Sequence, residues 1–259
     1  MDETYLKVLL DALVVCKTYK PKFGGGTGLS LAEFQTLYQA DPFYTWLGMD
    51  SPLMYAAHKA AGGMTSIYRQ IGIGCQRLVQ RIIMNNLSLT LEQASWSYQV
   101  QKTNAKFQTL SLDCRIALAD VRPAQHDEVK NWLQKACKEI GVSAEISHVI
   151  KGAVFEVRQG YKSKDSKRQN ADVANAASAY AEGYLPVLLL LSSQIDQDVA
   201  LRYKNARWLI LRGSQTGSTL TSTYEFCRQI LKYDLAEFFE RYSSVLKRET
   251  EIILKTLLG

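Results

Sequence analysis

The run LPVLLLLS, residues 185–192, decides the fold class, because no polar side chain interrupts it before Ser192. A continuous apolar run of this length predicts a strand that is buried on both faces of a sheet. After it we expect a short helix over Asp196–Ala206 and a further strand over Trp208–Arg212. Before it, residues 170–183 are rich in alanine and predict a helix. Strands that alternate with helices indicate a layered α/β structure.

The same alternation continues toward the N-terminus. The pattern predicts strands over Leu110–Ala119, Ile146–Ile150 and Ala153–Tyr161, and a helix over Gln125–Gly141. The fold class that we predict is therefore α/β (α+β), with a mixed central sheet flanked by helices.

The two ends of the chain have helical patterns. Apolar residues at helical spacing predict a helix over residues 3–18, and Ser30 with Glu33 forms a capping-box pattern at the start of a second helix. Residues 222–258 predict a long C-terminal helix. We therefore expect a helical N-terminal region, 1–108, packed on an α/β core with a C-terminal helix, 109–259.

Composition excludes several classes of protein. The chain has 259 residues, 47% hydrophobic and 22% charged, so it is not a disordered chain, a collagen-like repeat or a disulfide scaffold. The five cysteines form no Cys-x-x-Cys pair and no zinc-ligand spacing. The acidic N-terminus lacks a signal-peptide pattern, and no apolar stretch approaches about 18 residues, so we expect a cytoplasmic protein.

The strand over Ala153–Tyr161 carries the strongest indication of function. Because side chains alternate along a strand, Phe155 and Val157 face one side while Glu156 and Arg158 share the other. Glu156 is thus a carboxylate in an apolar strand, which is costly unless it is paired or holds a cation. Two interpretations follow: a structural pair with Arg158, or a metal ligand.

Positive charge follows this strand directly. The net charge of the chain is +6, and five basic residues with one acidic residue lie between 158 and 168. Such a segment suits contacts to phosphates. The candidate DNA-binding residues in and beside it are Gln159, Tyr161, Lys162, Lys164, Lys167, Arg168 and Gln169.

Asp113 is the second candidate carboxylate. It interrupts the apolar pattern of Leu110–Ala119, where it either caps a turn or supplies a ligand. A strand-entry Asp together with a Glu-x-basic triplet on a neighbouring strand is an arrangement that gathers carboxylates for Mg²⁺ beside a phosphate.

With these residues the sequence resembles the PD-(D/E)XK nuclease superfamily, particularly the type II restriction endonucleases. The resemblance covers residues 88–212: a helix, a strand with Asp113, a strand with Glu156-Val157-Arg158, an alanine-rich helix and the run 185–192. It implies a Mg²⁺-dependent endodeoxyribonuclease that cleaves double-stranded DNA to leave 5′-phosphates. It also implies that Asp113 and Glu156 bind the metal and that Arg158 stands at the position of the family's catalytic lysine.

The sequence departs from the family pattern at two points. Arg158 replaces lysine and cannot act as a base, although it can stabilise phosphate charge. Lys162 is the other candidate cation, about 13 Å further along an extended strand. The interval between Asp113 and Glu156 holds a whole helix, so Glu145, at the start of the preceding predicted strand, is the alternative first acid.

A second DNA-contacting surface is predicted on the helix around residue 75. Arg69, Gln76 and Arg77 belong to a face rich in Gln and Arg, the side chains that read purine edges. Because a palindromic DNA site matches a two-fold protein, a homodimer is expected. The alternatives are a non-catalytic nucleic-acid-binding protein with a decayed nuclease fold, and an interaction protein without nucleic acid.

Overall fold

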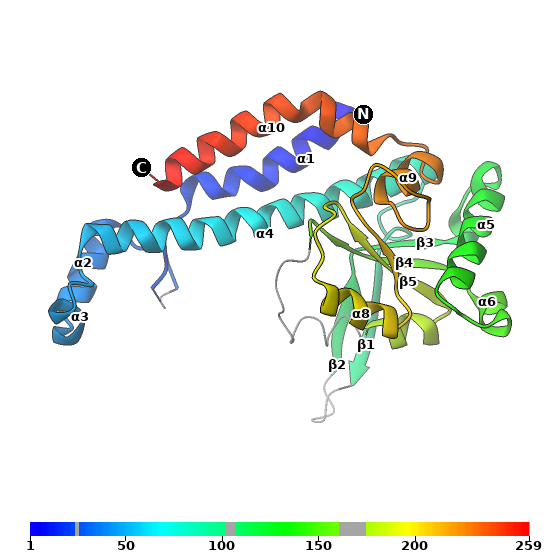
Figure 1. Cartoon of the computed structure of the whole chain (residues 1–259), viewed down its shortest axis with the longest axis horizontal. Coiled ribbons are helices and arrows are strands. Elements are labelled where there is room, and N and C mark those ends of the chain that lie inside the picture. Colours follow the sequence, from blue (N-terminus) through cyan, green and yellow to red (C-terminus); the bar gives the residue numbers. More distant parts are fainter. Residues whose placement is uncertain (24–25, 102–106, 161–174, 259) are drawn as a thin grey trace. The chain divides into compact units, whose positions relative to one another are not determined.

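The computed structural model describes residues 1–23, 26–101, 107–160 and 175–258 (Figure 1). The chain divides into two compact units, one formed by Met1–Gly74 and Arg241–Gly259 and the other by Cys75–Glu240. Both divisions fall within long helices, α4 (Pro52–Leu87) and α10 (Leu235–Leu258). Among the described residues, no helix is long and apolar enough to cross a membrane.

In its described part the first unit has helices and loops but no strand. Its N-terminal helix matches the prediction over residues 3–18, and the capping box at Ser30 is confirmed, because Glu33 N–H donates to Ser30 Oγ and Ser30 N–H donates to Glu33 Oε2. Besides parts of α4 and α10, the elements of this unit are α1 (Asp2–Val14), the 3₁₀ helix η1 (Val15–Thr18), α2 (Leu31–Gln39) and α3 (Pro42–Trp46).

Glycines in α4 are the points of close packing in this unit. A Cβ on Gly62 would lie 1.9 Å from the Tyr19 hydroxyl, and a Cβ on Gly63 would lie 2.7 Å from Leu257 in α10. Both glycines lie within the continuous helix, and because they lack a side chain they make room for these neighbours. The apolar contacts are reinforced by the ion pair between Lys17 and Glu249, 2.9 Å long.

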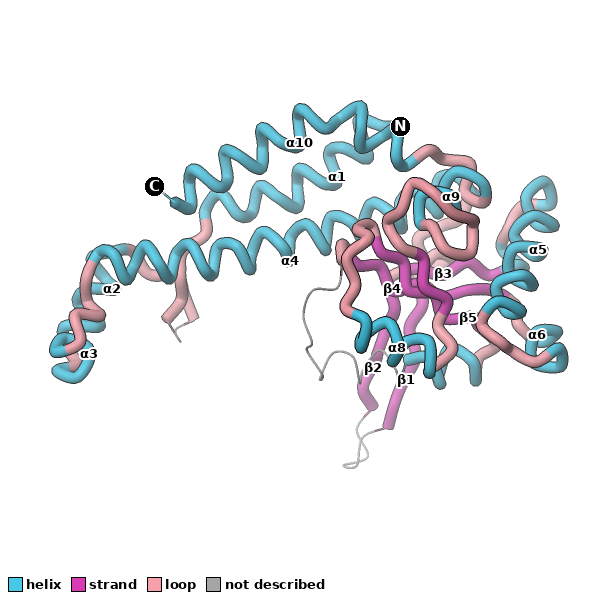
Figure 2. Tube along the Cα trace, viewed as in Figure 1, coloured by secondary structure: helices cyan, strands magenta, loops and turns pink. Residues whose placement is uncertain are grey.

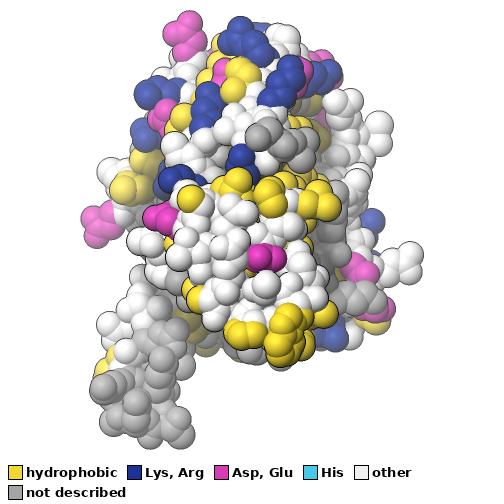
Figure 3. Space-filling model, turned by 90° about the vertical axis from the view of Figure 1, so that its left-hand side faces the viewer, with side chains coloured by type: hydrophobic (Ala, Val, Ile, Leu, Met, Phe, Trp, Pro, Cys, Tyr) yellow, Lys and Arg dark blue, Asp and Glu magenta, His cyan; other side chains and the backbone are white. Residues whose placement is uncertain are grey.

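Apolar side chains are exposed on α2, α3 and the start of α4. Figure 3 looks onto the side of Figure 1 on which these helices lie, and yellow apolar groups are visible there while most Lys and Arg side chains gather toward the top of the view. The exposed residues of this region include Leu37, Phe43, Trp46, Leu47 and Leu53.

The second unit contains two sheets within the described residues, shown in magenta in Figure 2. A four-stranded sheet has the order β3-β4-β5-β6; β3 is antiparallel to β4, whereas β4, β5 and β6 are parallel. A separate antiparallel hairpin is formed by β1 and β2. The strands are β1 (Trp96–Gln101), β2 (Phe107–Leu112), β3 (Cys114–Ala117), β4 (Gly152–Arg158), β5 (Tyr184–Leu190) and β6 (Leu209–Leu211).

Both faces of the four-stranded sheet are covered. On one face, Phe155 of β4 packs with Trp132 of α5 (Pro123–Glu139) and Phe226 of α9 (Thr223–Gln229). On the other face, Val154 and Leu188 belong to a core cluster with residues from β1, from the helical residues 175–181 and from α8 (Gln197–Asn205). All seven residues of β5 are buried, so the predicted α/β class with a mixed, helix-flanked sheet is confirmed.

Three predicted elements differ from the structure. The predicted strand over Ile146–Ile150 is helix α6 (Ala144–Val149), because the Ser143 hydroxyl accepts the Ile146 N–H and starts a helical turn. The helix predicted over residues 222–258 is broken into α9 and α10, and Lys232 in the break has a positive φ of 57°. The predicted strand over Leu110–Ala119 is likewise divided, since β2 ends and β3 begins on either side of Asp113.

Candidate active site at the β3–β4 pair

Asp113 and Glu156 come from neighbouring strands. In the antiparallel register Cys114 pairs with Phe155, the residue before Glu156. The Asp113 N–H also donates to the Phe155 carbonyl, at 2.9 Å, so Asp113 and Cys114 both face Phe155 and the strand bulges at Asp113. Asp113 thus lies beside the residue that precedes Glu156. The structure therefore brings the two carboxylates that the sequence singled out to one place.

The Asp113 side chain holds the adjoining strand. Its Oδ2 accepts the backbone N–H of Val157 at 2.8 Å, and its carbonyl oxygen accepts the side-chain amide of Gln80 at 3.2 Å. The backbone bends here, which explains why the predicted continuous strand is divided. A carboxylate accepts about four hydrogen bonds or ligand contacts, so the bond from Val157 is compatible with a further ligand role.

Glu156 lies in an apolar environment, as the alternation along β4 predicts. Only 5% of the residue is exposed, and the residue paired with it on β5 is Leu188. Its carboxylate forms an ion pair with Arg158, whose side chain is 12% exposed. The buried carboxylate is thus paired with a cation, which is one of the two arrangements that the sequence allowed.

A buried thiol reports the negative charge of this site. Burial raises the pKa of Cys114 well above its usual value, and the charges of Asp113 and Glu156 raise it further. Cys114 is therefore a neutral thiol that packs in the core, and the two carboxylates act on the same point.

The carboxyl ends of the parallel strands meet beside this pair. A Cβ on Gly213, after β6, would lie 2.0 Å from the carbonyl oxygen of Leu191, after β5, and the Gly213 N–H donates to the Ser192 carbonyl. Gly160, after β4, approaches Ser192 similarly, because a Cβ there would lie 3.2 Å from that of Ser192. In open α/β sheets, ligands bind at this edge. Sequence reasoning missed Ser192, which only the meeting of the three parallel strands would have indicated.

The remaining predicted residues are distributed as follows. Gln159 directly follows Arg158 at the end of β4 and is half-buried. Gln76 lies in α4 one helical turn before Gln80, on the same face, so part of the predicted Gln- and Arg-rich face belongs with the strand of Asp113. Arg77 is exposed on α4 in the second unit, whereas Arg69 belongs to the first unit. The residues that lie outside the described part of the chain are Tyr161, Lys162, Lys164, Lys167, Arg168 and Gln169.

Glu145 does not have the position that made it an alternative first acid. It lies in the first turn of α6, is exposed, and is on no strand. Hydrogen bonds from its own backbone and from Ser143 lower the pKa of this carboxyl, as is usual at a helix N-terminus. Its role is to stabilise the start of α6, and it is not a ligand candidate on a strand.

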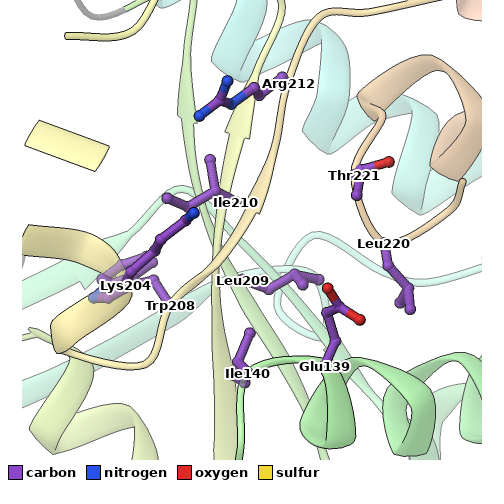
Figure 4. Close-up of a pocket in the computed structure, with 9 residues that line it drawn as sticks. All are labelled: Glu139, Ile140, Lys204, Trp208, Leu209, Ile210, Arg212, Leu220 and Thr221. Carbon is purple, nitrogen blue, oxygen red and sulfur yellow. The ribbon is translucent and has the colours of Figure 1, made fainter. Parts of the chain in front are cut away.

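A pocket lies at the other edge of the sheet. Its volume is about 610 Å³, and β6 lines it. Because β5 lies between β6 and β4, the pocket is distinct from the Asp113–Glu156 pair. Figure 4 shows apolar side chains between the charged groups of its lining. The lining residues are Glu139, Ile140, Lys204, Trp208, Leu209, Ile210, Arg212, Leu220 and Thr221.

The donor set of the carboxylate pair suits magnesium. Mg²⁺ is usually bound by one or two carboxylates, with waters and phosphate oxygens in the other positions. Within the described ranges, no group of three or more His, Cys, Asp or Glu side chains gathers to hold a metal by protein ligands alone. A metal at Asp113 and Glu156 would therefore depend on a phosphate for part of its coordination.

Comparison with known proteins gives no relative: no protein-family model, curated protein or solved structure matches this chain. The functional argument therefore depends on the geometry of this site.

Proposed function

We propose that this chain is a Mg²⁺-dependent endodeoxyribonuclease with Asp113 and Glu156 as its metal ligands. The observation that carries the proposal is the proximity of the two carboxylates: Asp113 Oδ2 accepts the N–H of Val157, the residue after Glu156, near the edge where the parallel strands end. The resemblance of the sequence to the type II restriction endonucleases implies the same two residues. Double-stranded DNA is the substrate that this similarity implies, with 5′-phosphates as the product ends.

Each residue of the pair has a distinct task in this proposal. A bound Mg²⁺ supplies positive charge that neutralises the scissile phosphate and favours attack by water. The Val157 N–H holds the Asp113 carboxylate in place, and Arg158 holds the Glu156 carboxylate in place. The guanidinium of Arg158 stabilises the negative charge that develops on the phosphate oxygens, but it does not take a proton.

The Glu156–Arg158 ion pair favours a second candidate, a non-catalytic nucleic-acid-binding protein with a decayed nuclease fold. A carboxylate that is neutralised by a fixed cation needs no metal to be buried. In that case the basic segment after β4 binds phosphates, and Asp113 serves only to hold Val157.

Cleavage of supercoiled plasmid by the purified full chain, in Mg²⁺ and in EDTA, tests the proposal. Glu156→Gln and Asp113→Asn preserve the shape of each side chain, and each should reduce Mg²⁺-dependent cleavage at least about a hundredfold. Because Glu156→Gln also leaves Arg158 without its carboxylate, cleavage is compared at a temperature at which circular dichroism shows that every variant is folded. Glu145→Gln is the matched control, because it removes an exposed carboxylate of α6 and should leave cleavage unchanged.

Filter binding of the same DNA over a range of salt concentrations separates the two candidates. Retention that weakens with salt, without cleavage in Mg²⁺, would establish the binding protein and refute the nuclease. The absence of both retention and cleavage would refute both candidates in favour of an interaction protein. Normal cleavage by Glu156→Gln would refute the assignment of the metal ligands.

A further inference from the structure

A second concentration of positive charge lies in α8 and the strand after it. Residues 199–224 contain four basic residues and no acidic residue. Two of the four, Lys204 and Arg212, line the pocket beside β6. This stretch is separate in sequence from the basic segment that follows β4. It therefore supplies a second candidate surface for a ligand with negative charge.

The backbone of Arg212 is held firmly at the end of β6. Its N–H donates to the Thr221 carbonyl at 2.9 Å, and its carbonyl accepts the Thr223 N–H at 2.8 Å. A parallel bridge between Arg212 and Ser222 accompanies these bonds. The point from which the side chain of Arg212 leaves the sheet is therefore fixed.

The charged ends of Arg212 and Lys204 are not used within the described part of the chain. Both residues are exposed, and neither side chain takes part in an ion pair or a hydrogen bond with any described residue. By contrast, Lys232 of the same unit is paired with Glu128. Arg212 and Lys204 are thus available for a ligand.

Both cations lie on one face of the sheet. Because successive side chains of a strand point to opposite faces, Arg212 shares the face of Ile210, whose side chain packs against the core cluster covered by α8. Lys204 belongs to α8 itself, and in Figure 4 it extends toward Ile210 and Arg212 on one side of β6. Glu139 lies on the other side of the strand, so its carboxylate does not stand between the two cations.

Arg212 and Arg158 leave the same end of the sheet. Leu189 of β5 pairs with Val157 of β4 on one side and with Leu211 of β6 on the other, so these three residues form one row across the parallel strands. Arg158 and Arg212 each follow this row directly, and the alternation along a strand gives both side chains the same face. Since neighbouring strands are about 4.8 Å apart, two strand spacings separate the two positions by about 10 Å.

This separation suits the backbone of a nucleic acid. Each strand of duplex DNA carries one phosphate for every ~3.4 Å of helix axis, so cations about 10 Å apart can contact phosphates a few nucleotides apart on one strand. Contacts of Arg and Lys with phosphates fix the position of a protein on the duplex without reading its sequence. A single small anion would occupy only one of the two positions, whereas a DNA strand contacts both.

We propose that Lys204 and Arg212 bind phosphates of the DNA strand whose scissile phosphate lies at the candidate active site, so that this strand crosses the end of the sheet from β4 to β6. The inference rests on the proposed function, because it takes DNA as the substrate, but it requires neither the metal nor cleavage. It assigns two phosphate-contacting residues outside the basic segment that follows β4.

DNA binding in EDTA, measured at several salt concentrations, tests the inference without cleavage. The association constant of the full chain for two short duplexes of unrelated sequence is measured by fluorescence anisotropy between about 50 and 200 mM salt. Each lost phosphate contact reduces the slope of log K against log salt concentration by about 0.9. Lys204→Gln and Arg212→Gln should each reduce the slope by about this amount with both duplexes, and the double variant by about 1.8.

Two control variants separate a phosphate contact from a general loss of positive charge. Lys135→Gln removes an exposed charge from α5, which covers the opposite face of the sheet, so it should leave the slope unchanged. Arg212→Lys keeps the positive charge at the end of β6 and should keep the slope. Because Lys204 and Arg212 are exposed, thermal unfolding followed by circular dichroism should be the same in their variants as in the wild type.

The outcomes distinguish this inference from the proposed function. Wild-type slopes in Lys204→Gln and Arg212→Gln, or an equal reduction in Lys135→Gln, would overturn the inference and leave the nuclease proposal as it stands. Reduced slopes in a chain that binds DNA but does not cleave it in Mg²⁺ would support the two phosphate contacts and refute the nuclease. A wild-type chain that binds neither duplex would overturn both.

Discussion

Removal of Arg158 should lower the free energy of unfolding of the sheet unit severely. Removal of Glu156 in the same variant should recover much of that free energy. The Glu156 side chain is 7% exposed, so Arg158→Met leaves a carboxylate that water cannot solvate. Breaking a buried pair in this way costs about 3–5 kcal/mol, whereas replacing both partners by neutral groups of similar size costs little. Because the free energy of unfolding of a domain is about 5–15 kcal/mol, the single variant should lose a large part of its stability.

Tryptophan fluorescence during urea unfolding is the suitable assay. Trp96, Trp132 and Trp208 are buried in the sheet unit, whereas Trp46 is 81% exposed in the helical unit and changes little on unfolding. The fluorescence change therefore reports the free energy of unfolding of the unit that contains the ion pair.

Lys232→Met provides the control in the same unit. Lys232 and Glu128 form an ion pair in which both side chains are more than a third exposed, so its loss should cost at most about 1 kcal/mol. The reasoning would be refuted if Arg158→Met lost no more than Lys232→Met. It would also be refuted if the double variant Glu156→Gln/Arg158→Met were no more stable than Arg158→Met.

Three further predictions concern other parts of the chain. A hydrogen bond from Lys17 lowers the pKa of Glu249, so this pair stabilises the helical unit above the usual carboxyl range and loses its effect as the pH falls through the lowered pKa. Lys17→Met should therefore lower the melting temperature followed by circular dichroism at pH 7 and have much less effect at pH 2. Burial raises the pKa of Cys75 to about 12, so the native chain at pH 8 should react slowly with a thiol reagent and the urea-unfolded chain rapidly; a fast native thiol would contradict the buried position. Gly213→Ala would press a methyl group against the backbone of the neighbouring strand and should cost about 1–3 kcal/mol in the free energy of unfolding, whereas Gly72→Ala, in an open helical position, should stabilise the helix by about 0.5–1 kcal/mol.

The central sheet could be predicted because burial on both faces leaves a pattern that depends on few distant contacts. The run 185–192 was correctly predicted as a strand since it contains no polar residue before its end, and β5 is buried throughout. The predicted alternation along β4 is confirmed. Phe155 lies on the face that packs against aromatic rings, and Glu156 lies on the opposite face, paired with Leu188. In both strands the sequence pattern and the packing agree.

The errors occur where a local hydrogen bond outweighs an apolar pattern. Ile146 and the apolar residues after it suit a strand by composition, but the Ser143 hydroxyl and the acidic first turn stabilise a helix. Packing outweighs propensity in α4. Glycine is a poor helix former, yet the helix runs unbroken from Pro52 to Leu87, and at Gly62 and Gly63 the absence of a side chain lets Tyr19 and Leu257 pack closely.

The sequence singles out the residues of the candidate site but not their proximity in space, and their function stays a prediction. Asp113 and Glu156 stand out because each is an acid within an apolar stretch, and that much is visible in the sequence. Their proximity depends on the antiparallel partnership of β3 with β4, two strands separated by α5 and α6 along the chain. The amide of Gln80 on the Asp113 carbonyl depends on the same long-range packing, so no local pattern indicates it.

Arg158 is the residue on which the two candidate functions differ, and its ion pair with Glu156 does not by itself decide between them. A guanidinium carries five N–H donors on two edges, so one edge can remain with a carboxylate while the other binds a phosphate. In a nuclease the ion pair would fix Arg158, which contacts the phosphate, next to Glu156, which holds the metal. In a binding protein the same arrangement would place a fixed positive charge at the end of β4, beside the predicted basic segment. Because the geometry serves both, the response of cleavage to Glu156→Gln carries more weight than any further detail of the ion pair.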